Sequence, residues 1–281
     1  MVIQVHFGDN LTVLKTVPNG VARLVYIDPP FNTGKRQTRK RTRKVRDPQG
    51  DHRGFKGQRY RTEVLGEMSF ADVFAEDRFL PFLEPRLREA KRLLTRDGSF
   101  FLHLDFREVH YAKVLCDQIF GRDCFMNEIV WAYDFGGRPK DRWPSKHDNI
   151  LWYALNPNDY VYKLEDVDRI PYLAPGLVTA EKAERGKVPT DVWWQTIVPT
   201  SGNERTGYPT QKPLKLLERI VRAHSHPDDL VVDFFAGSGT TGEAAAMHGR
   251  RALLIDDNPE AMRVMERRLA GYDAKFVGWP T

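Results

Sequence analysis

The 281-residue sequence contains only two cysteines, Cys116 and Cys124, and their positions fit neither a disulfide framework nor a metal site. We therefore expect no bound metal. The sequence also lacks any run of about 18 apolar residues, so neither a transmembrane helix nor a membrane partner is expected. The first residues, Met1 to Gln4, have no charged start and no apolar stretch behind it, which argues against a signal peptide. These absences favour a protein of the reducing cytoplasm.

Positive charge is concentrated in one segment. The net charge is +5 at pH 7, but twelve Lys or Arg and only two acids lie between positions 35 and 61, which leaves −5 on the rest. Clustered cations of this kind are typical of contact with the phosphates of DNA or RNA, although a solvated linker is the alternative. Residues 32–66 show no clear periodicity and are predicted to form a mobile loop that orders on binding. The candidate DNA contacts are Lys35, Arg36, Arg39, Lys40, Arg41, Arg43, Lys44, Arg46, Arg53 and Lys56, with Arg138 and Lys140 in a second basic loop at 134–148.

Apolar runs and amphipathic segments alternate along most of the chain. This alternation predicts an α/β fold with a doubly wound, mostly parallel sheet. Strands are expected at 2–7, 21–27, 99–104, 127–133, 149–153, 230–234 and 251–255. Helices are expected at 11–17, 84–95, 107–120, 213–223, 242–248 and 259–269, where Pro81 and Pro85 confine the second helix to 84–95 and Thr95 to Gly98 form a turn after it.

One stretch, residues 156–206, lacks this pattern. It is rich in proline and tyrosine and contains Trp193 and Trp194. We interpret it as an insertion that carries recognition and not as a continuation of the sheet; a simple cap over the core is the alternative. The chain then divides into a catalytic half at 1–155, which includes the basic loop 32–66, a target-recognition region at 156–206, and a cofactor-binding half of the same sheet at 207–281.

An acid follows the apolar run from Val21 to Ile27, in the sequence Asp28-Pro29-Pro30-Phe31. The prolines end the strand because proline cannot donate to a sheet ladder, and ligands of open α/β sheets bind at the carboxyl ends of strands. Asp28 can accept a hydrogen bond from an exocyclic amine, the carbonyl of Pro29 can accept a second, and Phe31 can stack on a base. The alternative is an ordinary Pro-Pro turn with a capping acid.

A second constellation lies in the last third of the chain. A strand, a small-residue turn from Phe235 to Thr241, a helix and a strand that ends at Asp256 make a nucleotide-binding unit. Gly237 and Gly239 let the backbone approach a ligand, and Asp256, 17 residues past Gly239, can hold ribose hydroxyls. The turn lacks the full dinucleotide fingerprint and the lysine of a phosphate loop, so a generic α/β turn is the alternative.

Together the two constellations resemble the S-adenosylmethionine-dependent DNA amino-methyltransferases. Asp28 to Phe31 match the family's catalytic motif, and the stretch from Val232 to Thr241 matches its cofactor motif, with Phe234 where proline is common. The resemblance assigns cofactor contacts to Asp9, Thr210, Lys212, Asp233, Phe235, Gly237, Ser238, Gly239, Thr240 and Asp256, with Asp9 at the adenine, Asp256 at the ribose, and Thr210 and Lys212 beside the methionine part.

The order of these motifs, with the catalytic one first, resembles the beta class of the family. It implies a Rossmann-like methyltransferase fold with a circularly permuted motif order and an inserted target-recognition region. The implied reaction is direct methyl transfer from S-adenosylmethionine to the exocyclic amine of a flipped base in double-stranded DNA. Neither Cys116 nor Cys124 follows a proline, which argues against methylation at the cytosine ring carbon.

Several points stay open from the sequence. An aspartate at the first position of the motif favours adenine N6 as the target atom. Phe31 stands where the family usually has tyrosine, which weakens this preference, so cytosine N4 stays equally open. A homodimer, a cognate restriction enzyme and association with the nucleoid are open as well. An RNA or protein amide methyltransferase, a nicotinamide dehydrogenase and a non-catalytic DNA-binding protein are the competing functions.

Overall fold

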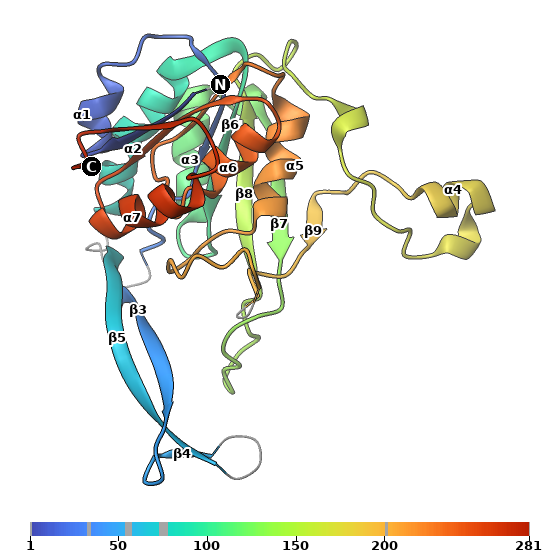
Figure 1. Ribbon diagram of the computed structural model, residues 1–281. Coiled ribbons are helices and arrows are strands. Elements are labelled where there is room, and N and C mark those ends of the chain that lie inside the picture. Colours follow the sequence, from blue (N-terminus) through green and yellow to red (C-terminus); the bar gives the residue numbers. More distant parts are fainter. Residues whose placement is uncertain (1, 33–34, 54–57, 73–77, 200–201, 281) are drawn as a thin grey trace.

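A large twisted sheet forms the centre of the molecule. The computed structural model describes residues 2–32, 35–53, 58–72, 78–199 and 202–280, and within them the sheet has nine strands in the order β12-β1-β11-β10-β2-β6-β8-β7-β9 (Figure 1). Neighbouring strands pair in parallel except where β8 meets β6 and β7. The strands are β1 (Ile3–Phe7), β2 (Ala22–Ile27), β6 (Leu94–Leu104), β7 (Phe125–Ala132), β8 (His147–Ala154), β9 (Val192–Trp194), β10 (Leu230–Asp233), β11 (Arg251–Asp256) and β12 (Ala274–Val277).

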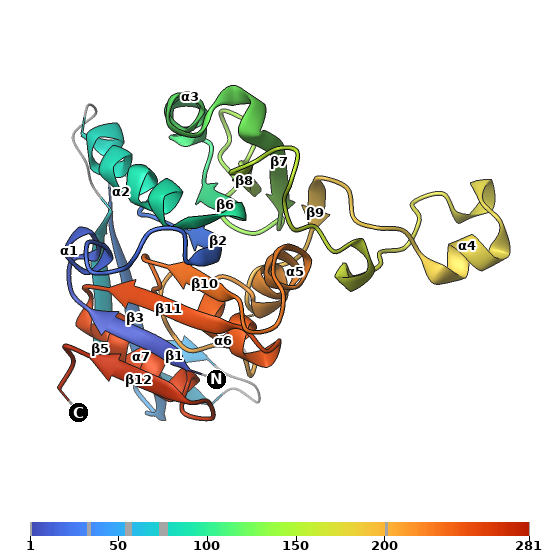
Figure 2. The same ribbon diagram turned by 90° about the horizontal axis from the view of Figure 1, so that it is seen from above.

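Helices cover both faces of this sheet (Figure 2). One core contains Val25 of β2 with residues of α1 (Asn10–Leu14), α2 (Phe79–Leu93) and α3 (Val109–Phe120). The other core contains Leu24 of β2 with residues of α5 (Leu214–His224), α6 (Thr240–Met247) and α7 (Pro259–Arg268). Successive side chains of a strand point to opposite faces, which is why the neighbours Leu24 and Val25 belong to different cores. The predicted doubly wound α/β fold is therefore confirmed.

The central strands bring the two sequence motifs together. β2 pairs in parallel with β10, with Leu24 beside Val231 and Val25 beside Val232. Parallel strands end at the same edge of a sheet, so Asp28, directly after β2, and the glycine turn after β10 emerge side by side. The pairing of β2 with β10 thus brings residues 28 and 237 to the same edge of the sheet.

The basic segment is not the irregular loop that the sequence suggested. It forms a long antiparallel hairpin of β3 (Lys35–Arg46) and β5 (Arg59–Asp72), with the short β4 (His52–Arg53) beside β5 (Figure 1). We call residues 35–53 and 58–72 the hairpin arm. The arm projects from the carboxyl edge of the sheet (Figure 1), and its sequence lacks the apolar alternation that reveals a strand.

The turn of the arm does carry a sequence signal. Asp47, Pro48 and Gly50 follow the preferences of a tight turn, and the amide of Gly50 donates to the carbonyl of Asp47 at 2.9 Å. A Cβ at position 50 would lie 2.3 Å from the backbone of Tyr60 across the arm. Only glycine fits this contact without a shift of the backbone.

Three boundaries differ from expectation by three residues or more. The second helix begins at Phe79 and not at 84, because Pro81 lies in the first turn, where its missing N–H costs no helical hydrogen bond, and Pro85 follows inside the helix. The expected turn from Thr95 to Gly98 belongs to β6, and α1 ends at Leu14 instead of residue 17.

The insertion extends away from the body and returns to it (Figure 2). It holds the short helices η3 (Leu164–Asp166), η4 (Pro175–Leu177) and α4 (Ala180–Arg185), and then β9, which pairs with β7. The expectation that 156–206 adds nothing to the sheet is therefore wrong for β9. A two-pronged ion pair, with both Arg219–Asp168 distances at 2.7 Å, ties the insertion to α5. The functional division of the chain at 156 and 207 stays a prediction.

No helix in the described part of the chain is long and apolar enough to cross a membrane. The described residues also contain no cluster of three or more His, Cys, Asp or Glu side chains that could hold a metal ion. The apolar faces of α2 and α3, which could have formed a dimer interface, are buried in the core of the monomer.

Candidate active site

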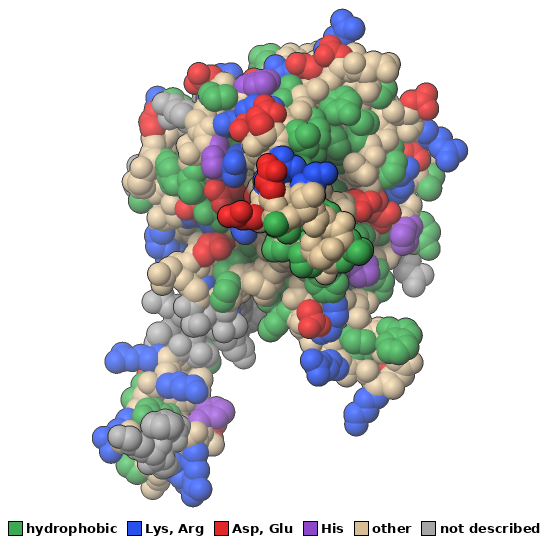
Figure 3. Space-filling model, turned by 90° about the vertical axis from the view of Figure 1, so that its right-hand side faces the viewer, with side chains coloured by type: hydrophobic (Ala, Val, Ile, Leu, Met, Phe, Trp, Pro, Cys, Tyr) green, Lys and Arg blue, Asp and Glu red, His purple; other side chains and the backbone are tan. Residues whose placement is uncertain are grey.

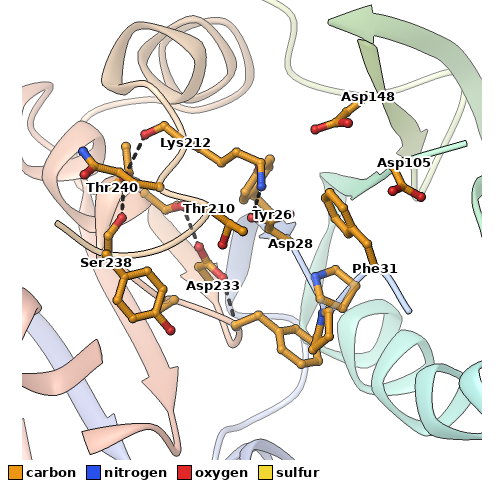
Figure 4. A pocket seen from close by; sticks show the side chains of 18 of the residues that line it. Tyr26, Asp28, Phe31, Asp105, Asp148, Thr210, Lys212, Asp233, Ser238 and Thr240 are labelled. Atoms are coloured by element: carbon orange, nitrogen blue, oxygen red, sulfur yellow. Dashed lines mark hydrogen bonds and ion pairs between the residues drawn. The ribbon is translucent and has the colours of Figure 1, made fainter. Parts of the chain in front are cut away.

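A cavity of about 860 Å³ opens at the carboxyl ends of the central strands (Figure 4). Its volume lies within the range of roughly 300–1,000 Å³ that is typical of ligand sites. Its wall contains all four residues of the predicted catalytic motif and nine of the ten predicted cofactor residues. The tenth, Gly239, lies behind the wall as the N-cap of α6, with a positive φ of 74°.

Asp28 is held at the cavity by an ion pair. Its Oδ2 contacts Nζ of Lys212, whose side chain is buried (Figure 4). Its Oδ1 is buried as well and has no hydrogen-bond partner among the described residues. A buried polar atom without a partner is costly unless a ligand supplies one. One oxygen of this carboxylate is therefore anchored, and the other is available to a donor that enters the cavity.

Phe31 forms part of the wall beside Asp28. The Lys212 ammonium lies 4.9 Å from the centre of its ring, and the ring of His103 lies 5.8 Å away at an angle of 31°. Packing of this kind fixes the orientation of the ring. A fixed aromatic ring next to a carboxylate provides a surface on which a flat base can stack.

A buried polar chain supports this part of the wall. The hydroxyl of Tyr26 contacts Nδ1 of His103 at 2.7 Å, and Nε2 of His103 contacts Oδ2 of Asp148 at 3.2 Å. The hydroxyl of Tyr133 donates to Oδ1 of Asp148 at 3.1 Å. Burial alone would raise the pKa of Asp148, but the hydrogen bond from His103 and the charges around it lower the pKa below its ordinary value. Burial raises the pKa of Tyr26 well above 10, so this hydroxyl stays protonated.

Sequence reasoning missed His103 and Asp148. His103 sits in an apolar run and Asp148 directly precedes the strand expected at 149–153, so each looks like an isolated polar residue. Only the pairing of β6 with β8 brings them together, with His103 beside Ile150 in the antiparallel register. A histidine directly after the apolar residues Phe100 to Leu102 was the one available signal.

The glycine turn is built on Asp233. Its carboxylate accepts hydrogen bonds from the amide of Phe235 at 3.0 Å and from the hydroxyl of Thr241 at 2.6 Å. Burial is the main influence on this group and raises its pKa to about 7. Gly237 in the same turn has a φ of 50°, a conformation that glycine adopts without strain.

Asp256 closes the other side of the turn. Its carboxylate accepts from the amide of Gly237 at 2.7 Å and from the amide of Asn258 at 2.9 Å. Burial raises its pKa to about 6. The ring of Tyr208 packs over the turn, and a Cβ at Gly237 would lie 3.2 Å from it. The acid that was expected at the ribose is thus fixed against the wall of the cavity.

The remaining predicted cofactor residues border the same space. Asp9 caps α1 by accepting from the amide of Thr12 at 2.9 Å. Ser238 and Thr240 share a hydrogen bond of 3.0 Å, and the hydroxyl of Thr240 donates to the carbonyl of Lys212 at 3.2 Å. Thr210, with a positive φ of 58°, lies in the same segment as Lys212. The segment 209–213 is therefore fastened to the glycine turn.

The predicted DNA contacts lie outside the cavity. Arg43, Lys44, Arg46 and Arg53 are exposed on the hairpin arm, while Lys35, Arg36, Arg39, Lys40 and Arg41 belong to β3. Arg138 and Lys140 are exposed in the loop between β7 and β8. Figure 3 shows Lys and Arg side chains on the two parts of the molecule that project below its body. Lys56 lies outside the described residues.

A family model described as DNA methylase matches residues 22–267, which is most of the chain. The chain belongs to this family. The predicted class of enzyme, which transfers a methyl group from S-adenosylmethionine to an amino group of DNA, is therefore confirmed. The match does not favour the RNA, protein, dehydrogenase or non-catalytic alternatives.

Two relatives show how widely this DNA methylase resembles its family. The chain is 28% identical over 275 residues to the DNA adenine methyltransferase YhdJ of Escherichia coli (strain K12), a match that covers 93% of this chain and 81% of that protein. It is 25% identical over 282 residues to the type II methyltransferase M.ScaI of Streptomyces caespitosus, with 95% and 81% covered.

Solved structures agree with the fold. The complex of M1.HpyAVI with S-adenosylmethionine has a TM-score of 0.59 at 20% identity and covers 96% of this chain and 99% of that one. The cytosine-N4-specific PvuII DNA methyltransferase has a TM-score of 0.62 at 16% identity, with 98% and 96% covered. At these identities the likeness supports the Rossmann-like methyltransferase fold and nothing finer.

Proposed function

We propose that this DNA methylase methylates the N6 amine of adenine within a specific sequence of duplex DNA. The observation that carries the proposal is the state of Asp28, with one oxygen bound to Lys212 and the other buried without a partner among the described residues. An exocyclic amine is the kind of donor that this oxygen requires. The adenine-specific relative from Escherichia coli, which matches 93% of the chain, supports adenine over cytosine.

The residues around the glycine turn fit S-adenosylmethionine. The carboxylate of Asp256 suits ribose hydroxyls, Asp9 suits the amine of the cofactor's adenine ring, and Ser238, Thr240 and Thr210 border the space for its methionine part. The positive φ of Gly237 keeps the backbone free of a side chain where a ligand approaches. When bound, S-adenosylmethionine supplies an electrophilic methyl group.

The chain's own groups orient the nitrogen that is methylated. Oδ1 of Asp28 accepts one hydrogen of the amine, and the carbonyl of Pro29 accepts the other. These two bonds direct the nitrogen lone pair towards the methyl group as the transition state forms. Lys212 positions Asp28, because its contact with Oδ2 fixes the carboxylate and leaves Oδ1 turned to the substrate.

The target base must leave the duplex to reach this site. An amine within a stacked base pair is not accessible to a residue inside a cavity, so the base rotates out of the helix. Phe31 then stacks on the flipped base, held in place by His103 behind it. Stacking on an aromatic side chain is worth about 1–3 kcal/mol per base, which offsets part of the cost of opening the pair.

The hairpin arm provides the DNA contact outside the cavity. A two-stranded ribbon fits the major groove of B-DNA, and the arm projects from the edge of the sheet at which the cavity opens (Figure 1). Its cations bind phosphates and position the duplex. We assign sequence recognition to the insertion 156–206 together with the loop between β7 and β8.

The partners in the cell follow from this activity. Type II methyltransferases among the relatives suggest a cognate restriction enzyme that reads the same sequence. The substrate places the protein in the cytoplasm, on the nucleoid. Light scattering of the free and DNA-bound protein tests whether it also forms a homodimer.

Nucleoside mass spectrometry on unmethylated DNA, incubated with the protein and S-adenosylmethionine, tests the proposal. We expect N6-methyladenine with the wild type and none with Asp28→Ala, while calorimetry shows that both proteins bind the cofactor. N4-methylcytosine instead would move the target to cytosine. Normal turnover by the Asp28→Ala protein would contradict the assigned mechanism.

A further inference from the structure

Trp143 is almost fully exposed, with a relative solvent accessibility of 94%, in the loop of residues 134–146 between β7 and β8. We call this segment the rim loop. Its neighbours Arg138, Lys140 and Arg142 are exposed as well. The loop thus presents a large flat ring between cations, which is the combination that proteins use to contact both the bases and the phosphates of nucleic acid.

The rim loop is fixed to the mouth of the cavity. Phe135 and Gly136 on its first side and Ser145 on its second side line the cavity wall. Nζ of Lys146 donates to the carbonyl of Gly136 at 2.7 Å and so joins the two sides. Trp143 precedes Ser145 by two residues, so its Cα lies within about 7 Å of the wall.

A flipped base leaves a gap in the duplex, and this gap must face the mouth of the cavity that receives the base. Bases on either side of the gap lose a stacking partner, which costs a few kcal/mol. Apolar side chains inserted between base steps recover part of that loss in other proteins that deform DNA. The proposed function assigns Phe31 to the flipped base itself, so a group that fills the gap must be a different one.

We propose that Trp143 inserts into the base stack at the position that the target base vacates, while Arg138, Lys140 and Arg142 hold the phosphates on either side. The inference rests on the proposed function, because it requires base flipping. Trp143 is then a positioning residue: it contacts the DNA, stabilises the opened duplex and takes no part in methyl transfer.

The experiment compares two synthetic duplexes that carry the sequence found to be methylated by sequencing of treated DNA. In one duplex the target base is paired normally, and in the other it faces an abasic nucleotide, so that little opening is required. Single-turnover methylation rates are measured for the wild type, Trp143→Ala, Trp143→Phe and Trp194→Ala. Trp194 is a matched control because it is also exposed, at 77%.

We expect Trp143→Ala to slow methylation of the paired duplex by about 5- to 150-fold, the range for the loss of one stacked ring. On the abasic duplex most of this loss should disappear, and Trp143→Phe should retain most activity on both. Trp194→Ala should change both rates by the same factor. Because the side chain of Trp143 is almost fully exposed, the thermal unfolding of the Trp143→Ala protein should match that of the wild type.

Two results would overturn the inference and leave the proposed function intact. The first is an unchanged rate for Trp143→Ala on the paired duplex. The second is an equal loss on both duplexes, which would indicate an ordinary groove contact. Absence of any methylated sequence in the DNA treated with the wild type would instead overturn the proposed function, and the role of Trp143 with it.

Discussion

The hairpin arm allows a quantitative prediction about DNA binding. Arg43, Arg46 and Arg53 are exposed on the arm and form no ion pair with any described residue. Arg61 differs, because it contacts Glu63 at 2.8 Å and lies near Asp47, so its charge is already compensated within the arm. We therefore change the first three residues to Gln together and leave Arg61 in place.

The expected magnitude follows from counterion release. Each phosphate that a cation neutralises adds about 0.9 to the slope of log affinity against log salt. Three lost contacts lower this slope by up to ~2.7, so between 50 and 200 mM salt the wild type should lose about 40-fold more affinity than the variant. At low salt the variant binds more weakly, and the two affinities converge as salt rises.

Fluorescence anisotropy with a labelled duplex, measured over that range of salt, provides the slopes. The matched control replaces Lys15, Arg96 and Arg122, three exposed cations that lie outside the cavity wall and off the arm. The control should keep the wild-type slope, because it removes the same net charge without removing phosphate contacts. Equal salt slopes for the arm variant and the wild type would refute the assignment of phosphate contacts to the arm. An equal decrease of the slope in the arm variant and in the control would show that only the net charge of the protein matters.

Two further predictions concern the cavity. Lys212→Met should lower kcat about 10- to 150-fold, because it removes a charge-assisted hydrogen bond to Asp28. Lys212→Arg should recover part of this loss. A rise in KM for S-adenosylmethionine without a change in kcat would instead indicate that Lys212 contacts the cofactor, as predicted from sequence. Ribose hydroxyls favour the ionised form of Asp256, whose pKa is about 6, so cofactor affinity by calorimetry should fall roughly tenfold from pH 7 to about pH 5. Affinity independent of pH would contradict that contact.

Sequence predicts best those features of the site that belong to the end of a single strand. Asp28 and Asp256 each follow a buried apolar run, and the glycines of the turn require positive φ. These features are local, so they are visible in the order of the residues. Their convergence was also predictable, because the ends of parallel strands meet at one edge of a sheet.

Contacts between distant segments were not accessible in this way. The ion pair of Lys212 with Asp28 joins residues that are 184 positions apart, and the contact of His103 with Asp148 depends on an antiparallel pairing that no periodicity reveals. The hairpin arm was missed for a different reason, because its sequence is dominated by Lys and Arg and shows no apolar alternation. Sequence thus predicted residues that line the cavity, and it missed the contacts between distant segments that hold them in place.

The charge of the cavity adds an argument about the cofactor. Seven aspartates but only four Lys or Arg residues contribute to its described wall, and burial gives two of those acids, Asp233 and Asp256, raised pKa values of about 7 and 6. A wall with excess acid disfavours its own ionisation and attracts a cation. S-adenosylmethionine carries a positive sulfonium, whereas the thioether that remains after methyl transfer is neutral. The same acids therefore favour the methyl donor over the spent product, and Lys212, by neutralising Asp28, keeps the one carboxylate needed by the base from competing for that charge.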